Sequence, residues 1–315
     1  MKLQTQLPLE KHAPAINYHS KLVLLGSCFA ENMAEKFSYY KFQNKVNPLG
    51  ILFHPLAILE LLERTYQNKP YTEKDVFFSN GSWQSFHAHS ILNSTSKTDI
   101  LDSLNTALKS TQNQLEHASH VILTFGTAWV YKHIESKMIV ANCHKQPQKE
   151  FEKSILSVYQ LQDTFKSIVS ILKSFNSNVS VVFSISPVRH LKDGFIENNQ
   201  SKAHLISALH SEIITSKNSS YFPSYELLMD ELRDYRFYKE DMVHPNQIAI
   251  DYIWEKFQSI WIDPEVNSTM QEVNQLQKGL AHKPFNPRST EHADFLLSLS
   301  KKVQDLESQF PFMKF

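Results

Sequence analysis

The fold is decided by one short stretch, Leu22-Val23-Leu24-Leu25-Gly26-Ser27-Cys28-Phe29-Ala30-Glu31. Four apolar residues that end at a glycine predict a buried strand. Residues 27–37 then have helical periodicity, because Phe29, Met33 and Phe37 fall at positions i, i+4 and i+8 and share one face. In an α/β protein, such a strand-to-helix turn lies at the carboxyl edge of the sheet, where ligands bind.

Two candidate nucleophiles, Ser27 and Cys28, stand at this turn. The amino end of the following helix directs backbone N–H groups and the positive end of a dipole at the ligand site. The same field favours the thiolate of a cysteine. The alternative is structural: Ser27 would cap the helix, and Cys28 would be a small buried hydrophobe.

A second motif, Asp241-Met242-Val243-His244-Pro245-Asn246, stands near the other end of the chain, just before a predicted helix at 245–261. The Asp-x-x-His spacing can place both side chains in one loop, with the carboxylate beside the imidazole. This is the base and its orienting carboxylate in a hydrolytic triad.

The chain order, with the nucleophile early and Asp-x-x-His late, resembles that of the SGNH, or GDSL-type, hydrolases. The whole pattern resembles the GSCFA family, a bacterial group named for the five residues that stand here as Gly26 to Ala30. The resemblance covers roughly residues 20 to 260. It extends through Asn47-Pro48-Leu49-Gly50, Phe125-Gly126-Thr127, Asn142-Cys143-His144-Lys145, Ser186-Pro187-Val188-Arg189 and Asp234-Tyr235-Arg236-Phe237-Tyr238.

The resemblance implies an SGNH-hydrolase-like, flavodoxin-like α/β fold and an esterase or acyltransferase. Its substrate would be an ester-linked acyl group on a carbohydrate or similar polar acceptor. His244 would be the base and Asp241 its orienting group. Aligning Gly-Asp-Ser with residues 26–28 makes Cys28 the nucleophile, which we favour on register; Ser27 would serve if the turn were shifted by one residue.

Candidate oxyanion donors follow from the same resemblance. In the SGNH pattern a glycine at the position of Gly50 offers its N–H group, with Asn47 in the same turn; the alternative for Gly50 is a turn glycine with positive φ. SGNH enzymes commonly carry Gly-x-Asn-Asp after the strand predicted at 120–125. Here Gly126-Thr127-Ala128-Trp129 lacks the asparagine, so the Thr127 hydroxyl is the candidate replacement.

Other residues are expected around the pocket. Asn142 lies in a predicted lid or pocket wall and is a further oxyanion donor, and His89 is expected on the rim. Arg189, at a sheet edge, would either bind a carboxylate or phosphate of the substrate or form a structural ion pair. Ser201-Lys202 is interpreted as solvent-facing or as part of the pocket rim.

Two other classes of function remain open at this stage. The missing Gly-x-Asn-Asp favours a non-catalytic ligand-binding module, whereas the intact Asp-x-x-His opposes it. A metal-dependent enzyme would use His87, His89 and His144, because His87 and His89 share a face if they lie on a strand. We expect no metal and no cofactor.

Composition limits the remaining possibilities. The chain has 315 residues, of which 42% are hydrophobic, with 32 basic and 32 acidic residues. A balanced charge without a basic stripe argues against nucleic acid. No apolar run suggests a membrane span or a secretory leader, which predicts a cytoplasmic protein. Two cysteines are too few for a disulfide framework. The sequence gives no indication of oligomeric state.

The elements alternate as in a three-layer, doubly wound parallel sheet. Strands are predicted near 22–25, 120–125, 180–185 and 221, and helices at 55–66, 97–119, 152–175 and 198–217, with a hairpin at 129–142. We expect an SGNH-like GSCFA domain at 1–262. A C-terminal helical extension at 263–315 is expected to form a hairpin whose second helix spans 292–310.

Overall fold

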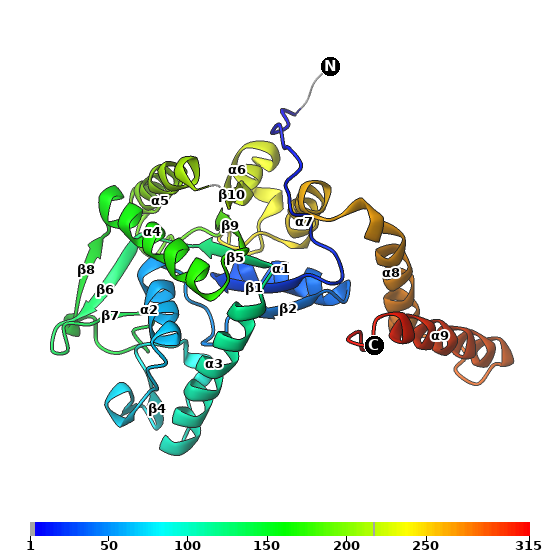
Figure 1. Ribbon diagram of the computed structural model, residues 1–315, viewed down its shortest axis with the longest axis horizontal. Coiled ribbons are helices and arrows are strands. Elements are labelled where there is room, and N and C mark those ends of the chain that lie inside the picture. The colour runs from blue at the N-terminus through cyan, green and yellow to red at the C-terminus, as the bar shows by residue number, and fades with distance from the viewer. Residues whose placement is uncertain (1–3, 217) are drawn as a thin grey trace.

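A five-stranded parallel sheet forms the centre of the protein (Figure 1), for which the computed structural model describes residues 4–216 and 218–315. The strand order is β10-β9-β5-β1-β2. The strands are β1 (Lys21–Gly26), β2 (Gln43–Val46), β5 (His120–Phe125), β9 (Ser180–Ile185) and β10 (Ser219–Phe222).

Helices cover both faces of this sheet, which confirms the three-layer α/β fold. Leu22 and Leu24 of β1 pack with α1 (Cys28–Tyr39) and α7 (Gln247–Trp261). Val23 and Leu25 face the other way, because successive strand residues alternate between faces. Four helices cover that second face: α2 (Pro55–Tyr66), α3 (Lys97–His117), α4 (Val158–Phe175) and α5 (Phe195–Thr215).

The strand order reverses between β1 and β5. From β1 the chain moves outward to β2 and then returns to β5, β9 and β10 on the other side. Such a reversal leaves a crevice at the carboxyl ends of the two central strands, and ligands of open α/β sheets bind there. The turn after β1 carries Ser27 and Cys28, and the turn after β5 carries Gly126 and Thr127.

Smaller elements surround the sheet. The antiparallel pairs are β3 (Phe77–Ser79) with β4 (Ser82–Gln84), and β6 (Trp129–His133) with β7 (Ile139–Val140) and β8 (Phe151–Ile155). Short helical segments lie at Glu73–Asp75, Ser90–Leu92, Gln148–Glu150, α6 (Ser224–Glu226), Leu227–Leu232, Tyr235–Phe237 and Pro264–Val266. None of the helices in residues 4–216 and 218–315 combines the length and apolar content needed to cross a bilayer.

The predicted C-terminal helical hairpin is confirmed as α8 (Asn267–Ala281) and α9 (Thr290–Gln309), which pack against each other (Figure 1). Met270, Val273 and Leu276 of α8 are buried in the same apolar cluster as α1 and α7. The hairpin therefore docks on one face of the α/β domain.

Several predicted boundaries were wrong. The helix predicted from residue 152 begins at Val158, because Phe151–Ile155 pairs with β6 as a strand. The helix predicted at 198–217 begins at Phe195 and ends at Thr215; residue 217 lies outside the described residues. His87 lies in a turn and His89 caps the short helix Ser90–Leu92, so neither is on a strand and the shared-face argument does not apply.

Candidate active site

The turn after β1 requires a glycine. Gly26 has φ +143°, and a Cβ there would lie 2.1 Å from the carbonyl oxygen of Thr124 on β5. The next residue, Ser27, donates its N–H to that same oxygen at 3.0 Å. Only a residue without a side chain lets the two strand ends approach this closely.

Ser27 caps helix α1. Its hydroxyl accepts the N–H of Phe29 at 3.3 Å, and the residue is 2% exposed. This hydrogen bond satisfies one of the free N–H groups of the first helical turn. The geometry is that of the structural alternative for this serine.

Cys28 is the first residue of α1 and is half-buried. Burial and the charge of Glu31 raise the pKa of its thiol, and the opposing effects of its own N–H group and of Lys202 are smaller. The N–H groups at the start of the helix do lower the pKa of the thiol, as expected, but desolvation penalises the charged form more strongly. A thiol at this position needs a base to remove its proton.

Asp241 and His244 meet in one loop, as predicted. Nδ1 of His244 lies 2.7 Å from Oδ2 of Asp241. The other carboxylate oxygen accepts the N–H groups of Val243 and His244 at 2.9 and 3.0 Å. These two N–H groups, followed by the imidazole, lower the pKa of Asp241 to about 2. The carboxylate is therefore ionised at neutral pH and fixes the orientation of the ring.

The Asp241–His244 loop is attached to the end of β9. Arg189 donates its N–H to the carbonyl oxygen of Val243 at 3.2 Å. The adjacent His190 packs against the turn after β5. A Cβ on Gly126, in that turn, would lie 2.7 Å from Nε2 of His190. The loop and the β5 turn are thus joined through residues 189 and 190.

His190 is a residue that the sequence analysis did not single out. Its Nε2 is buried and has no hydrogen-bond partner among the described residues. Burial, together with the charges of Lys202 and His244, lowers its pKa to about 3, so the ring is neutral. Its position directly after the Ser186-Pro187-Val188-Arg189 motif was the available signal.

Ser201 and Lys202 are buried, and the prediction that they face solvent or the rim was wrong. Lys202 is 1% exposed, and its Nζ donates to the carbonyl oxygens of Gly126 and Ser186, both at 2.7 Å. Burial lowers the pKa of this lysine to about 7, against the effects of Cys28 and Glu226. The lysine therefore lies beneath the carboxyl edge of the sheet.

The candidate oxyanion donors already have partners. Gly50 donates its N–H to the carbonyl oxygen of Asn47 at 2.8 Å, and Gly126 donates to that of Phe53 at 2.7 Å. The Thr127 hydroxyl lies 2.9 Å from Ser201 Oγ and accepts the N–H of Trp129 at 3.0 Å. In this state Thr127 is not free to replace the missing asparagine.

Asn47 and Gly50 shape the β2 turn. The Asn47 side-chain oxygen accepts the N–H of Gly26 at 2.8 Å, and its amide donates to Glu31 at 3.3 Å. Gly50 has φ +73°, and a Cβ there would lie 2.5 Å from the Cβ of His89. Gly50 is therefore a turn glycine with positive φ, which was the alternative for this residue. Asn47 stabilises the turn after β1 through its hydrogen bond to Gly26.

Two remaining pocket candidates, Asn142 and His89, form hydrogen bonds within their own turns. Asn142 accepts the N–H of His144 at 2.8 Å in its own turn. His89 lies beside Gly50 and accepts the N–H of Ile91 at 3.3 Å. Neither residue is shown by a hydrogen bond to reach Cys28 or His244.

Arg189 is held by aromatic rings. Its Nε donates to the Tyr238 hydroxyl at 3.1 Å, and its guanidinium lies 4.1 Å from the centre of that ring and 5.2 Å from that of Tyr235. Within residues 4–216 and 218–315, no carboxylate lies within ion-pair distance of it. The structural ion pair, one of the two alternatives, is therefore absent from this part of the chain.

The three histidines of the metal alternative are engaged elsewhere. His87 lies between Glu60 and Asp75, at 3.1 and 3.3 Å. His144 donates from Nε2 toward the carbonyl oxygens of Ser85 and Ala88. The described part of the chain contains no group of three histidine, cysteine or acidic side chains placed to share a metal ion.

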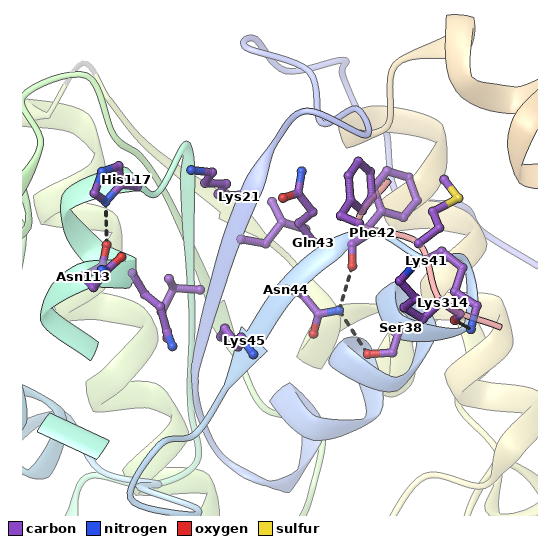
Figure 2. A pocket seen from close by; sticks show the side chains of 15 residues that line it. Lys21, Ser38, Lys41, Phe42, Gln43, Asn44, Lys45, Asn113, His117 and Lys314 are labelled. Atoms are coloured by element: carbon purple, nitrogen blue, oxygen red, sulfur yellow. Dashed lines mark hydrogen bonds between the residues drawn. The ribbon is translucent and has the colours of Figure 1, made fainter. Parts of the chain in front are cut away.

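A separate cavity of about 540 Å³ lies at the opposite end of the sheet (Figure 2). Its lining includes Lys21 at the start of β1, Phe42 just before β2, Lys45 on β2, His117 at the end of α3, and Lys314. This cavity is remote from the carboxyl edge and takes no part in the candidate site.

Comparison with known proteins gives a family and a set of distant structural neighbours. The GSCFA family profile matches residues 21–257, and the profile of the GSCFA domain protein C-terminal domain matches residues 273–315. A comparison with curated protein sequences found no match.

Three solved structures are similar in outline. A provisionally described platelet activating factor from Streptococcus pneumonia has a TM-score of 0.42 and 10% identity, covering 79% of this chain and 86% of that chain. A family 3 carbohydrate esterase from Clostridium thermocellum has a TM-score of 0.34 and 9% identity, covering 82% and 98%. A family 3 carbohydrate esterase from Talaromyces cellulolyticus has a TM-score of 0.37 and 8% identity, covering 80% and 99%.

Proposed function

This chain belongs to the GSCFA family, and we propose that it hydrolyses or transfers an ester-linked acyl group at the carboxyl edge of its sheet. The observation that carries the proposal is the 2.7 Å hydrogen bond between Asp241 and His244. It orients an imidazole whose Nε2 has no hydrogen-bond partner among the described residues. A general base in a hydrolytic triad has this arrangement.

In the proposed reaction, Cys28 is the nucleophile. His244 takes the thiol proton at Nε2 while the sulfur attacks the ester carbonyl carbon. The tetrahedral intermediate collapses, the carbon–oxygen bond breaks, and the proton passes from His244 to the departing alcohol. Water, or a second alcohol in a transfer reaction, then attacks the thioester with His244 again as base, which releases the acyl product and restores the thiol.

Cys28 is preferred to Ser27 because of their different positions at the start of α1. Ser27 is buried, and its hydroxyl is engaged as the helix cap, whereas Cys28 is half-buried. The Cys28 N–H, in the first helical turn, is the proposed oxyanion donor. Gly50 and Gly126 are less suited to that role, because their N–H groups already bond carbonyl oxygens.

We propose a carbohydrate or similar polar alcohol as the acyl acceptor. Arg189, whose guanidinium has no carboxylate partner in the described part of the chain, is assigned to an anionic group of such a substrate. This assignment is the first of the two alternatives that the sequence left open, the binding of a substrate carboxylate or phosphate.

A panel of acyl esters and sugar acetates tests the proposal. Purified protein is expected to turn over at least one of them, and Cys28→Ala and His244→Ala are expected to abolish that turnover. The matched control is His19→Ala, since His19 is exposed and lies before β1. No turnover by the wild type, or equal turnover by all four proteins, contradicts the proposal.

A non-catalytic binding module is the second candidate. It is favoured by one observation: the hydroxyl of Thr127 and the N–H groups of Gly50 and Gly126 are all engaged within the protein. Binding of a sugar acetate without turnover, unchanged in Cys28→Ala, would support this candidate.

A further inference from the structure

Lys202 is a buried cation that the proposed reaction has not used. Its Nζ donates to two main-chain carbonyl oxygens at 2.7 Å, and the residue is 1% exposed. Carbonyl groups satisfy its N–H donors without neutralising its charge. No carboxylate within residues 4–216 and 218–315 forms an ion pair with it. Burial of an unpaired ammonium is costly, so a lysine in this position calls for an explanation.

The carbonyl partners place the ammonium under the crevice between the two central strands. Gly126 follows β5, and Ser186 follows β9. On the neighbouring strand, Gly26 is paired with Thr124 of β5, and Ser27 donates its N–H to that same residue. Cys28 follows Ser27 directly, and the positive charge of Lys202 lowers the pKa of its thiol, although burial raises that pKa more.

We propose that Lys202 is a positioning residue that holds a positive charge beneath Cys28 and stabilises the negative charge that forms on its sulfur. This inference rests on the proposed role of Cys28 as nucleophile. When the S–H bond breaks, the proton goes to His244 and the electron pair stays on sulfur. The ammonium is fixed in advance by its two carbonyl bonds, so no reorganisation is needed when the charge appears.

Other charged and titratable groups face this pair. His190, from the loop after β9, is neutral because burial lowers its pKa to about 3. Tyr225 of α6 has its ring centre 5.6 Å from the ammonium, and Glu226 acts on it electrostatically. Glu31 of α1 opposes the thiolate. Among the residues just named, Lys202 is the one whose positive charge opposes the effect of the Glu31 carboxylate on the Cys28 thiol.

The rate of alkylation of Cys28 by iodoacetamide, measured from mild acid to mild alkali by peptide mapping, tests this role without any ester substrate. Lys202→Met is expected to slow alkylation about tenfold, the equivalent of one pKa unit, below pH 7, where the lysine keeps its charge, and to change it less in mild alkali. Lys202→Gln, which keeps N–H donors but not the charge, is expected to behave similarly. Lys192→Met, which changes an exposed lysine, is the matched control.

Cys143 in the same protein reports on folding. Burial raises the pKa of its thiol to about 11, so its alkylation is slow while the protein is folded. An unchanged Cys143 rate together with a slowed Cys28 rate supports the inference. Alkylation of Cys28 at the wild-type rate below pH 7 in folded Lys202→Met overturns it.

The wild-type protein gives an independent test if the variants do not fold. Burial lowers the pKa of Lys202 to about 7, so the log rate of Cys28 alkylation should show a shoulder where the lysine loses its proton, and His244→Ala should retain it. A uniform unit slope from mild acid to mild alkali in both proteins overturns the inference. Failure to turn over any ester, by contrast, would contradict the proposed function and leave these alkylation results unchanged.

Discussion

Nδ1 of His244 lies 2.7 Å from Oδ2 of Asp241, while the second oxygen of the carboxylate accepts two backbone N–H groups of the same loop. The carboxylate therefore holds the ring and the backbone of the loop together. The side chains remain partly exposed, at 39% for the histidine and 48% for the aspartate. An imidazole that is both oriented and accessible can exchange protons with a substrate.

We expect His244→Ala to lower ester turnover about a thousandfold or more, because it removes the proposed general base. The melting temperature should change little, since the side chain is partly exposed. Steady-state kinetics and thermal unfolding, with His19→Ala as the control, check both expectations. Near wild-type turnover by His244→Ala would show that the triad assignment is wrong.

Turnover should fall in mild acid, because a protonated His244 cannot accept the thiol proton. Asp241 cannot cause this loss, since its pKa is lowered to about 2 and it stays ionised in mild acid. The measurement is kcat/KM against pH, with thermal unfolding recorded over the same range. A flat profile from mildly acidic to neutral pH would argue against a histidine base.

Exchanging the two adjacent candidates separates nucleophile from cap. Ser27→Ala should lower the free energy of unfolding by about 1 kcal/mol, because a helix cap is lost, and should leave turnover largely intact. Cys28→Ala should abolish turnover with a smaller effect on folding. If instead Ser27→Ala is inactive and Cys28→Ala is active, the enzyme is a serine hydrolase; if both retain activity, the stretch is structural.

Gly26→Ala should lower the free energy of unfolding by more than about 4 kcal/mol or prevent folding, because the added Cβ meets a backbone oxygen at 2.1 Å. Gly81→Ala is the matched control: Gly81 also has positive φ, at +76°, but nothing lies within 4 Å of its Cβ position. The control should cost only about 1 kcal/mol. Equal losses in chemical denaturation would show that strand contact is not what demands glycine at position 26.

His87 should make stability depend on pH. Its pKa is raised: burial opposes the charged form, but its bonds to Asp75 and Glu60 outweigh that effect. A raised pKa means that its contribution is complete below about pH 6.5 and is lost as pH rises through the folded-state pKa. The pKa values of Glu60 and Asp75 are lowered, so their contributions are lost as pH falls below their ordinary range.

We therefore expect His87→Leu to lower the free energy of unfolding by about 3 kcal/mol near pH 6, and by less in alkali. Denaturation midpoints at several pH values check this, with His117→Leu, at an exposed position on α3, as the control. A loss that does not vary with pH would mean that packing rather than charge accounts for the contribution of His87.

The sequence predicted β1, β5 and β9 because each is an apolar run buried on both faces. It did not predict β2, since Gln43-Asn44-Lys45-Val46 is a polar edge strand without such a run. A strand of this kind is stabilised by its hydrogen-bonded ladder with β1. Pairing between two separate segments leaves no local pattern in the sequence of either one.

The residues of the candidate site also differ in how far their positions could be predicted from the sequence. Asp241 and His244 are three residues apart, so their meeting is a local event that spacing reveals. Lys202 is brought to Gly126 and Ser186 by the packing of α5 on the sheet. A lysine on a helix is ordinarily exposed. The available signal was that Lys202, Leu205 and Leu209 share one helical face, and both leucines are buried.

Tyr18, which precedes β1, stacks on Phe42 at 4.5 Å and also contacts the ring of Phe310, 5.1 Å away. The apolar cluster on this face extends from Ile16 to Met313. This cluster therefore cannot be completed until residues 306 and 313 have left the ribosome. In the nascent chain, α1 can cover part of this face of β1 early, whereas the side of the cluster that packs on α7, α8 and α9 stays exposed to chaperones until those helices are made.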